Sequence, residues 1–254
     1  MPWDPKQYLN FEHERLRPAA DLLARVPLGG ADAIFDLGCG AGNVTRLLAE
    51  RWPEAAITGV DSSAEMLARA QAALPAAAWI EADLRAWAPS EPADLVFSNA
   101  ALHWLEDHAA LFPRLAGWVK PGGRLAVQMP ANFDHPSHRA VHEICRSEPW
   151  RARFKGLRDA AGVHSLAEYH GWLAPLAKHQ DLWETTYLHV LEGEDPVLEW
   201  FKGSLLVPCL EALPEEFHEA FLEAYRLRVR AAYPKDPRGR TLMRFRRLFL
   251  IATF

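Results

Sequence analysis

Cysteine is scarce in this sequence, and the few cysteines lie far apart. Only Cys39, Cys145 and Cys209 occur among 254 residues. An odd number at wide spacing argues against a disulfide framework, which is typical of small secreted proteins, and favours a reducing compartment. We therefore expect a cytoplasmic protein.

Long apolar runs and signal-peptide features are also missing. No stretch approaches the roughly 18 uninterrupted apolar residues of a membrane-spanning helix. Residues 1–5 show neither the basic region nor the apolar segment with which a signal peptide begins. We expect no association with a membrane.

Positive charge is not in excess either. The 28 Lys and Arg residues are outnumbered by 33 Asp and Glu residues, which gives a net charge of −5. Nucleic acids and anionic membrane surfaces are bound by broad positive fields, so neither is expected as a partner. A small anionic substrate would therefore need local cations in its binding site. For the oligomeric state, we expect a monomer or a weak dimer.

The most informative stretch is residues 36–43, where an acidic residue ends an apolar run and precedes the alternating glycines Gly38, Gly40 and Gly42. The apolar residues before it predict a buried strand, and residues 44–51 predict a helix. Glycine at such a turn permits backbone angles that a side chain forbids and lets a ligand contact bare backbone. Because a helix start adds unpaired N–H groups and partial positive charge, we predict a site for a polar or anionic ligand.

The spacing of the glycines separates two kinds of nucleotide site. A dinucleotide fingerprint has the form Gly-x-Gly-x-x-Gly, and here Asn43 takes the place of its third glycine. The sequence also has no Tyr-x-x-x-Lys pair for hydride transfer. These features disfavour a nicotinamide oxidoreductase and favour another nucleoside ligand. For the motif alone, a glycine-rich turn in an unrelated α/β protein is the alternative.

Strands and helices alternate from residue 33 to residue 129. Later strands are expected at 56–61, 78–83, 94–99 and 124–129, a helix cap at Ser62 or Ser63, and a helix at 106–119 that ends in the stop signal 120–123. This alternation predicts a parallel sheet covered on both faces, with the ligand beyond the carboxyl ends of the strands.

Polar residues end four successive predicted strands, namely Asp36, Asp61, Asp83 and Asn99. Because the carboxyl ends of parallel strands lie along one edge of a sheet, these side chains should line that edge. Asp61 follows the second strand, where a carboxylate accepts hydrogen bonds from ribose hydroxyls. A helix N-cap would explain each acid singly but not the series.

The second half of the sequence departs from the alternation. A sixth strand is expected at 181–191, helices at 195–206 and 214–232, and a seventh strand at 246–252. The basic run 146–158 predicts either a solvated helix face or a lid over an acidic substrate. Three histidines, His135, His138 and His142, are spaced for one helix face, but Pro136 lies among them, so we predict no metal site.

The N-terminal segment supplies candidate cations. Tyr8, Phe11 and Arg15 fall at three- and four-residue steps, which places them on one helix face. Packing alone would explain the aromatics, whereas Arg15 and Arg17 are suited to bind a carboxylate in a bidentate manner.

We expect one domain over residues 1–254. Residues 1–28 would form an N-terminal helical lid, 29–130 the cofactor-binding core, 131–180 and 192–240 helical cap insertions, and 181–191 and 246–254 the final strands.

Almost the whole chain resembles the trans-aconitate 2-methyltransferase family, a branch of the class I S-adenosylmethionine-dependent methyltransferases. The similar segments are parts of 3–26, then 61–63, 81–83, 99–104, 125–130, 162–164, 185–187 and 247–249. The resemblance implies a seven-stranded, Rossmann-like α/β fold, a mostly parallel sheet whose last strand is antiparallel, and a helical cap.

The resemblance also implies a cofactor, S-adenosylmethionine, whose product is S-adenosylhomocysteine, and no metal. Asp36, Gly38, Gly40 and Gly42 would surround its amino-acid end, Asp61 its ribose and Asp83 its adenine. The full implied cofactor set is Asp36, Gly38, Cys39, Gly40, Gly42, Asp61, Ser62, Met66, Asp83, Leu84, Asn99 and Ala100.

The implied reaction is the formation of a methyl ester on a small carboxylic acid, with trans-aconitate as the leading substrate. A carboxylate is already ionised at neutral pH, so no catalytic proton transfer is needed, and His103 and Trp104 would position the methyl group. The implied substrate-binding residues are Tyr8, Arg15, Arg17, His164, Tyr187 and Arg247.

Two departures from the family pattern leave alternatives open. Val207 stands where the family has an arginine, and Tyr169-His170 stands where paired tyrosines are usual. A less charged acid, or a hydroxyl, amine or carbon acceptor, would be the alternative substrate, and the last three would need a general base such as His103 or His164. A module that binds the cofactor without turnover is a further alternative.

Overall fold

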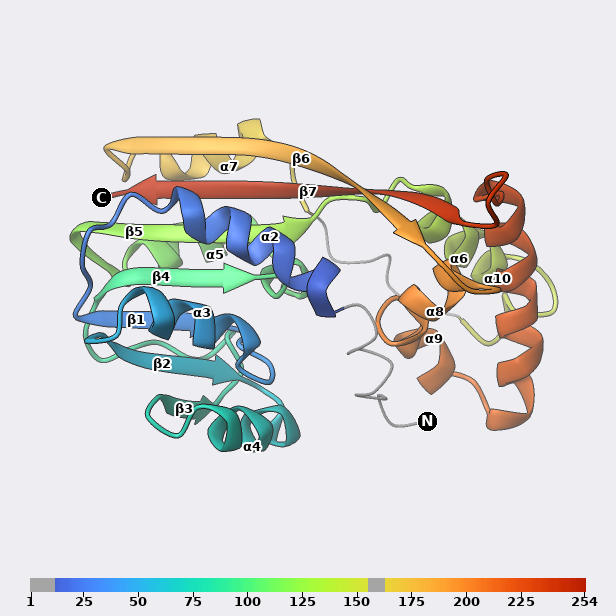
Figure 1. Cartoon of the computed structure of the whole chain (residues 1–254), viewed down its shortest axis with the longest axis horizontal. Coiled ribbons are helices and arrows are strands. Elements are labelled where there is room, and N and C mark those ends of the chain that lie inside the picture. The colour runs from blue at the N-terminus through green and yellow to red at the C-terminus, as the bar shows by residue number, and fades with distance from the viewer. Residues whose placement is uncertain (1–11, 155–162) are drawn as a thin grey trace. The chain divides into compact units, whose positions relative to one another are not determined.

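Seven strands form one sheet in the order β3-β2-β1-β4-β5-β7-β6 in this computed structural model, which describes residues 12–154 and 163–254 and the side chains from residue 16 onward (Figure 1). The strands are β1 (Ala33–Leu37), β2 (Ala56–Asp61), β3 (Ala78–Glu81), β4 (Ala93–Asn99), β5 (Val119–Pro130), β6 (His179–Leu191) and β7 (Thr241–Thr253).

The described residues form two compact units. The sheet unit lies within Arg15–Pro130, Ala161–Thr185 and Arg247–Phe254, and the helical unit within Met1–Glu14, Ala131–Ala160 and Thr186–Arg246. Residues 163–180, assigned above to the cap, therefore belong to the sheet unit. The organisation as one domain stays a prediction.

Helices of the sheet unit flank its parallel strands. They are α2 (Glu12–Arg25), α3 (Asn43–Arg51), α4 (Ala64–Ala73), η1 (Leu102–Trp104), α5 (His108–Ala116) and α7 (Leu166–Leu173). Strand β1 pairs in parallel with β2 on one side and with β4 on the other, so the strand order reverses between β1 and β4. In open α/β sheets such a reversal is where ligands bind, beyond the carboxyl ends of the strands.

The last strand runs against the others. Strand β7 pairs antiparallel with β5, from Arg124↔Thr253 to Pro130↔Arg247, whereas β4 and β5 are parallel. The predicted fold class is thereby confirmed.

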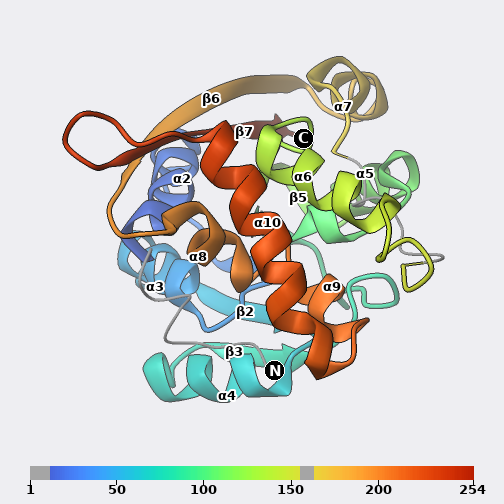
Figure 2. The same cartoon turned by 90° about the vertical axis from the view of Figure 1, so that its right-hand side faces the viewer.

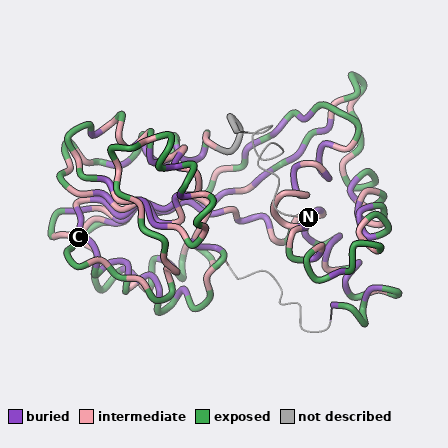
Figure 3. The backbone as a smooth tube through the Cα atoms, turned by 90° about the horizontal axis from the view of Figure 1, so that it is seen from below, coloured by how far each residue is buried: buried purple, intermediate pink, exposed green. Residues whose placement is uncertain are grey.

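Continuous apolar runs explain why the central strands are buried on both faces. Leu95, Val96 and Phe97 of β4 are fully buried, as are Leu125 and Val127 of β5, and Figure 3 marks buried residues in purple along the backbone. Helices on both sides leave no solvated face, so alternation with polar residues is lost.

The predicted stop signal at 120–123 is wrong. Helix α5 ends at Ala116, and β5 already begins at Val119. Its pairing with β4 shifts register between Ala93 and Leu95, and Gly122 has a positive φ of 84°. Proline and glycine therefore form an irregularity within the strand, a bulge that such residues also favour.

Several other predicted bounds differ from the structure. The helix expected at 195–206 ends earlier, as α8 (Pro196–Lys202), because Gly203 stops it, and a separate short helix, α9 (Val207–Glu211), follows with Pro208 in its first turn. Strand β7 begins at Thr241 rather than at residue 246, while β3 ends at Glu81, before Asp83.

The helical unit has its own apolar core. It is built by α6 (Pro136–Arg146), α8, α9, η2 (Glu215–Phe217) and α10 (His218–Ala232), and α6 and α10 lie side by side in Figures 1 and 2. Phe221 and Tyr225 of α10 are fully buried in this core. The thiols of Cys145 and Cys209 lie 3.9 Å apart within it, and both cysteines are free.

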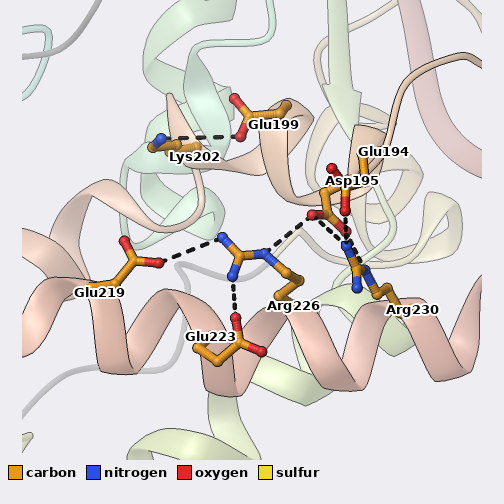
Figure 4. A network of polar contacts seen from close by, with 8 residues as sticks. All are labelled: Glu194, Asp195, Glu199, Lys202, Glu219, Glu223, Arg226 and Arg230. Carbon is orange, nitrogen blue, oxygen red and sulfur yellow. Dashed lines mark hydrogen bonds and ion pairs between the residues drawn. The ribbon is translucent and has the colours of Figure 1, made fainter.

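An ion-pair network joins the start of α8 to α10 (Figure 4). Asp195, at the N-cap position of α8, makes no capping hydrogen bond with its side chain. Its carboxylate instead lies 3.1 Å from Arg226 Nε and 2.5 Å from Arg230 Nε, and the Asp195 side chain is only 14% exposed. Two guanidinium groups on successive turns of α10 thus share one largely buried carboxylate.

We expect Asp195→Ala to lower the free energy of unfolding of the helical unit by about 1 to 2 kcal/mol, because it leaves two cations without their shared partner. The loss should shrink at high salt. Glu199→Ala is the matched control, since Glu199 is 46% exposed and 4.0 Å from Lys202, a pair that should contribute little. Denaturant unfolding with hydrogen exchange of α10 amides tests this, and equal effects of both variants would contradict it.

Among the described residues, no helix has both the length and the apolar character that crossing a membrane requires.

Candidate functional site

The turn after β1 is held by the neighbouring strand. The backbone N–H groups of Gly38 and Cys39 both donate to the carbonyl of Val60, at 2.8 and 3.2 Å. Helix α3 then begins at Asn43, with Gly42 at its N-cap position. Strand, turn and helix start are thus arranged as the sequence predicts.

The three glycines of this turn do different work, although all have positive φ. A Cβ on Gly38 would lie 2.2 Å from the Cβ of Ala101, and one on Gly42 would lie 2.9 Å from the ring of Trp79. A Cβ on Gly40 would have no heavy atom within 4 Å. Gly38 and Gly42 are therefore needed for packing, and Gly40 alone presents bare backbone to open space, where a ligand would lie.

Asp36 is a buried carboxylate beside this turn. It is 1% exposed, and its Oδ2 accepts a 2.6 Å hydrogen bond from the hydroxyl of Thr45 on α3. Burial raises the pKa of Asp36 to about 7, the Thr45 hydrogen bond opposes this rise, and the negative charge of Asp61 adds to it. A carboxylate in this state would be stabilised by a positively charged ligand.

Asp61 has hydrogen-bonding capacity left over. Its Oδ2 accepts from the N–H of Gly40 and its Oδ1 from the N–H of Ser63, both at 2.9 Å. Each carboxylate oxygen can accept a second bond, so the carboxylate is fixed in place and still able to bind a ribose diol. Ser63, rather than Ser62, caps α4, because its hydroxyl accepts from the N–H of Met66.

The loop after β3 is held in place by two arginine side chains. Asp83 is paired with Arg85 at 2.5 Å, and this partner lowers the pKa of Asp83 to about 2. Arg114 of α5 donates to the carbonyls of Leu84 and Arg85, at 2.7 Å each. The loop predicted to face the adenine is therefore anchored, and its cofactor role stays a prediction.

The segment after β4 is strained and lies where the acceptor was expected. Ala100 has a φ of 53°, rare for a residue with a Cβ, and its N–H donates to the carbonyl of Gln128 at 2.9 Å. Asn99 Oδ1 is buried, and within the described part of the chain it has no hydrogen-bond partner. Such strain persists where the surroundings enforce it, often at functional sites.

The two predicted wall residues follow on η1. His103 is 8% exposed and Trp104 is 57% exposed, and their ring centroids are 4.9 Å apart. An indole this exposed gains little from burial, so a role in positioning fits it better than a role in the core.

A buried polar relay supports η1. His108 Nε2 lies 3.0 Å from the carbonyl of Leu102 and must donate to it, so His108 Nδ1 accepts from the hydroxyl of Tyr169 at 2.6 Å. The N–H of His164 donates to the same hydroxyl at 3.2 Å. Burial lowers the pKa of His108, which favours the neutral ring. The Nδ1 atom of His164, a predicted substrate-binding residue, also lies 3.0 Å from Glu168 Oε1.

Arg247 is buried near the carboxyl end of β5. It is 5% exposed, and its Nη1 lies 3.4 Å from Oε1 of Gln128, a fully buried amide. The preceding residue, Arg246, contacts the carbonyl of Ala131 and the carboxylate of Asp134 instead. Of the two adjacent arginines, only Arg247 is directed into the sheet unit.

The predicted substrate residues are divided between the two units. Arg17 lies exposed on α2 of the sheet unit, and Tyr187 is buried in the helical unit with its ring 6.4 Å from His189. Tyr8 and the side chain of Arg15 lie outside the described residues. Val207 opens α9 of the helical unit. The substrate set therefore stays a prediction.

The remaining predicted residues surround the turn. Cys39 is buried, and burial raises the pKa of its thiol, so the sulfur is a packing group and no nucleophile. Ser62 is exposed, and Met66 is partly exposed on α4. Within the described residues, no group of three His, Cys, Asp or Glu side chains is placed to hold a metal ion.

Sequence reasoning missed three residues of this site. Thr45 binds Asp36, Trp79 packs on Gly42, and Gln128 contacts Arg247. Gln128 did carry a signal, because it is a lone amide within the apolar run 125–130, and a polar residue in a buried strand needs a partner.

The residues present fit S-adenosylmethionine. Gly40 leaves room at the turn, Asp61 retains acceptors for two hydroxyls, and the buried Asp36 favours a nearby cation. The fit rests on these three residues, which β1, β2 and the turn between β1 and α3 bring to one edge of the sheet.

Known proteins match the chain over most or all of its length. Residues 34–123 match the family model of a methyltransferase domain. The chain is 53% identical over 253 residues to a trans-aconitate 2-methyltransferase of Azoarcus sp. (strain BH72), covering 99% of each. It is 50% identical over 259 residues to a protein of the same name from Streptomyces avermitilis, covering 98% of this chain and 96% of that one.

A solved structure shares the fold. Phosphoethanolamine N-methyltransferase 2 of Haemonchus contortus, determined with phosphomonomethylethanolamine and S-adenosylhomocysteine, is similar with a TM-score of 0.56 at 15% identity. The similarity covers 93% of this chain and 52% of that one.

Proposed function

Since the chain belongs to the trans-aconitate 2-methyltransferase family, we propose that it forms the methyl ester of trans-aconitate. The membership confirms the family predicted from the sequence, and with it an S-adenosylmethionine-dependent methyltransferase. It also excludes the alternative function as a nicotinamide oxidoreductase. The proposed acceptor is a small carboxylic acid.

The proposed chemistry needs positioning rather than proton transfer. S-adenosylmethionine, when bound, supplies an electrophilic methyl group on a sulfonium. An acceptor carboxylate forms the new C–O bond as the C–S bond breaks, and no proton moves. The chain's own contribution is to hold the two partners in line and to exclude water from charges that are neutralised.

Each group of the site has a role in this proposal. Asp36, Gly40 and Asp61 hold the cofactor, His103 and Trp104 shape the space for the methyl group, and Arg247 attracts a carboxylate. The single observation that supports an acidic acceptor best is the burial of Arg247, 5% exposed beside the amide of Gln128. A general base at His103 or His164 is not required.

Calorimetry and a methyl-transfer assay test the proposal. We expect S-adenosylhomocysteine to bind and NAD not to bind. Labelled cofactor should transfer its methyl group to trans-aconitate far better than to a monocarboxylic control, at a rate that does not rise through the histidine pH range. Transfer to a hydroxyl or amine acceptor, with a rate that follows histidine ionisation, would overturn it. Cytoplasmic location and a monomer or weak dimer stay predictions.

A further inference from the structure

Gln128 lies across the strand reversal from the residues that fit the cofactor best. Asp36, Gly40 and Asp61 follow β1 and β2, on one side of that reversal. Asn99 ends β4 on the other side and pairs in register with Gln128 of β5. Arg247 enters from β7, opposite Pro130. The amide and the guanidinium therefore belong to the acceptor half of the edge.

The orientation of the Gln128 amide follows from its neighbour. A guanidinium can only donate hydrogen bonds, so the oxygen Oε1 must be the atom that faces Arg247, at 3.4 Å. The NH₂ group is then directed elsewhere. Nε2 is buried and has no hydrogen-bond partner within the part of the chain that the structure describes.

An unpartnered amide nitrogen in a fully buried side chain is costly. Gln128 has no exposed surface, and leaving a buried donor without an acceptor costs about 1 to 3 kcal/mol. The missing partner must be an acceptor. Because a guanidinium is adjacent, an anionic acceptor is favoured over a neutral one.

We propose that Gln128 determines substrate specificity, by binding, together with Arg247, a carboxylate of the acceptor that is not methylated. This inference rests on the proposed function. The amide N–H and the guanidinium are both permanent donors, so the clamp binds a carboxylate without any proton transfer. An acid that lacks this carboxylate would leave the buried Nε2 of Gln128 without an acceptor, so the clamp discriminates against such an acid.

The test is the kinetics of Gln128→Leu on two classes of acid. With trans-aconitate we expect KM to rise about 10- to 100-fold, the loss of one hydrogen bond to a charged group. Dicarboxylates such as glutaconate each lack one carboxylate of trans-aconitate. For the dicarboxylate that lacks the clamped carboxylate, Gln128→Leu should not raise KM. Gln128→Glu should raise KM further, because its own carboxylate would occupy Arg247.

The controls separate this inference from a loss of fold and from a wrong substrate. Gln71→Leu makes the same change at an exposed position of α4 and should leave KM unchanged. The affinity of Gln128→Leu for S-adenosylhomocysteine should stay within about twofold. If that variant does not fold, Gln128→Met, of nearly equal length, takes its place.

Two failures are distinguishable. If the unchanged protein binds S-adenosylhomocysteine but methylates another acid, the proposed substrate is wrong, and Gln128→Leu is measured on that acid. If trans-aconitate is methylated, but KM of the Gln128 variants stays within about twofold or rises equally on every acid, the clamp is wrong.

Discussion

Asp36→Asn should weaken cofactor binding and at the same time stabilise the protein without cofactor. The variant removes a buried charge that a positively charged ligand would stabilise, and we expect the affinity for S-adenosylmethionine to fall by about 10- to 100-fold, as when a buried charge loses its partner. The amide still accepts the hydrogen bond that Thr45 donates to Asp36 at 2.6 Å. Calorimetric titration and thermal unfolding measure the two effects.

The gain in stability depends on pH in a defined direction. The pKa of Asp36 is raised from 3.8 to about 7 in the folded chain, so the folded state holds the proton more tightly than the unfolded state. Stability is therefore lost as pH rises from about 4 to about 7, and at most about 4 kcal/mol is involved. Asp36→Asn should flatten this dependence, and its advantage should be small near pH 4.

Cofactor binding to the unchanged protein should release protons near neutral pH. A nearby positive charge lowers the pKa of Asp36 from about 7, so up to about half a proton should leave at pH 7. Titrations in buffers of different ionisation enthalpy measure it. Thr45→Val, which removes the hydrogen bond that lowers the pKa of Asp36, should move the release to higher pH. Binding without proton release in both proteins would contradict the role given to Asp36.

The order of elements in the sheet unit was predictable because its signals are local. Each strand from β1 to β4 is a short apolar run with a polar residue at or next to its end, and Asp36, Asp61 and Asn99 lie at the predicted edge. The errors occur where one signal has two meanings. The Pro-Gly-Gly of 121–123 suits a helix stop and a strand bulge equally, and only pairing with β4 decides between them.

The acceptor side of the site was harder to predict because its contacts join distant parts of the chain. Gln128 and Arg247 are 119 positions apart, and His108 and Tyr169 are 61 apart. Nothing in the local sequence pairs them. Tyr169, part of the Tyr169-His170 departure from the family pattern, is an example. It is fully buried and hydrogen-bonded to His108, so it supports η1 rather than contacting the substrate space directly.

Gly40→Val and Gly42→Val should give different defects, although the two glycines are two positions apart in one turn. Gly42→Val should mainly lose stability, and Gly40→Val should mainly lose cofactor binding. Both have positive φ, at 54° and 81°, so both variants lose about 1 to 2 kcal/mol to backbone strain. A side chain on Gly42 would also meet Trp79 at 2.9 Å and Ala70 at 3.1 Å. Overpacking there should cost a further 1 to 3 kcal/mol, about as much as in other well-packed cores.

Gly40→Val should instead abolish cofactor binding in a protein that still folds. Its side chain would enter open space, the space assigned to the cofactor, so we expect an affinity loss above about 100-fold, equivalent to more than about 3 kcal/mol. Unfolding midpoints and S-adenosylhomocysteine titrations, made on both variants, separate the defects. Gly59→Ala, whose Cβ would meet Trp79 at 2.5 Å without a positive φ, should behave like Gly42→Val. A Gly40 variant that binds the cofactor normally would mean that the cofactor does not approach this turn.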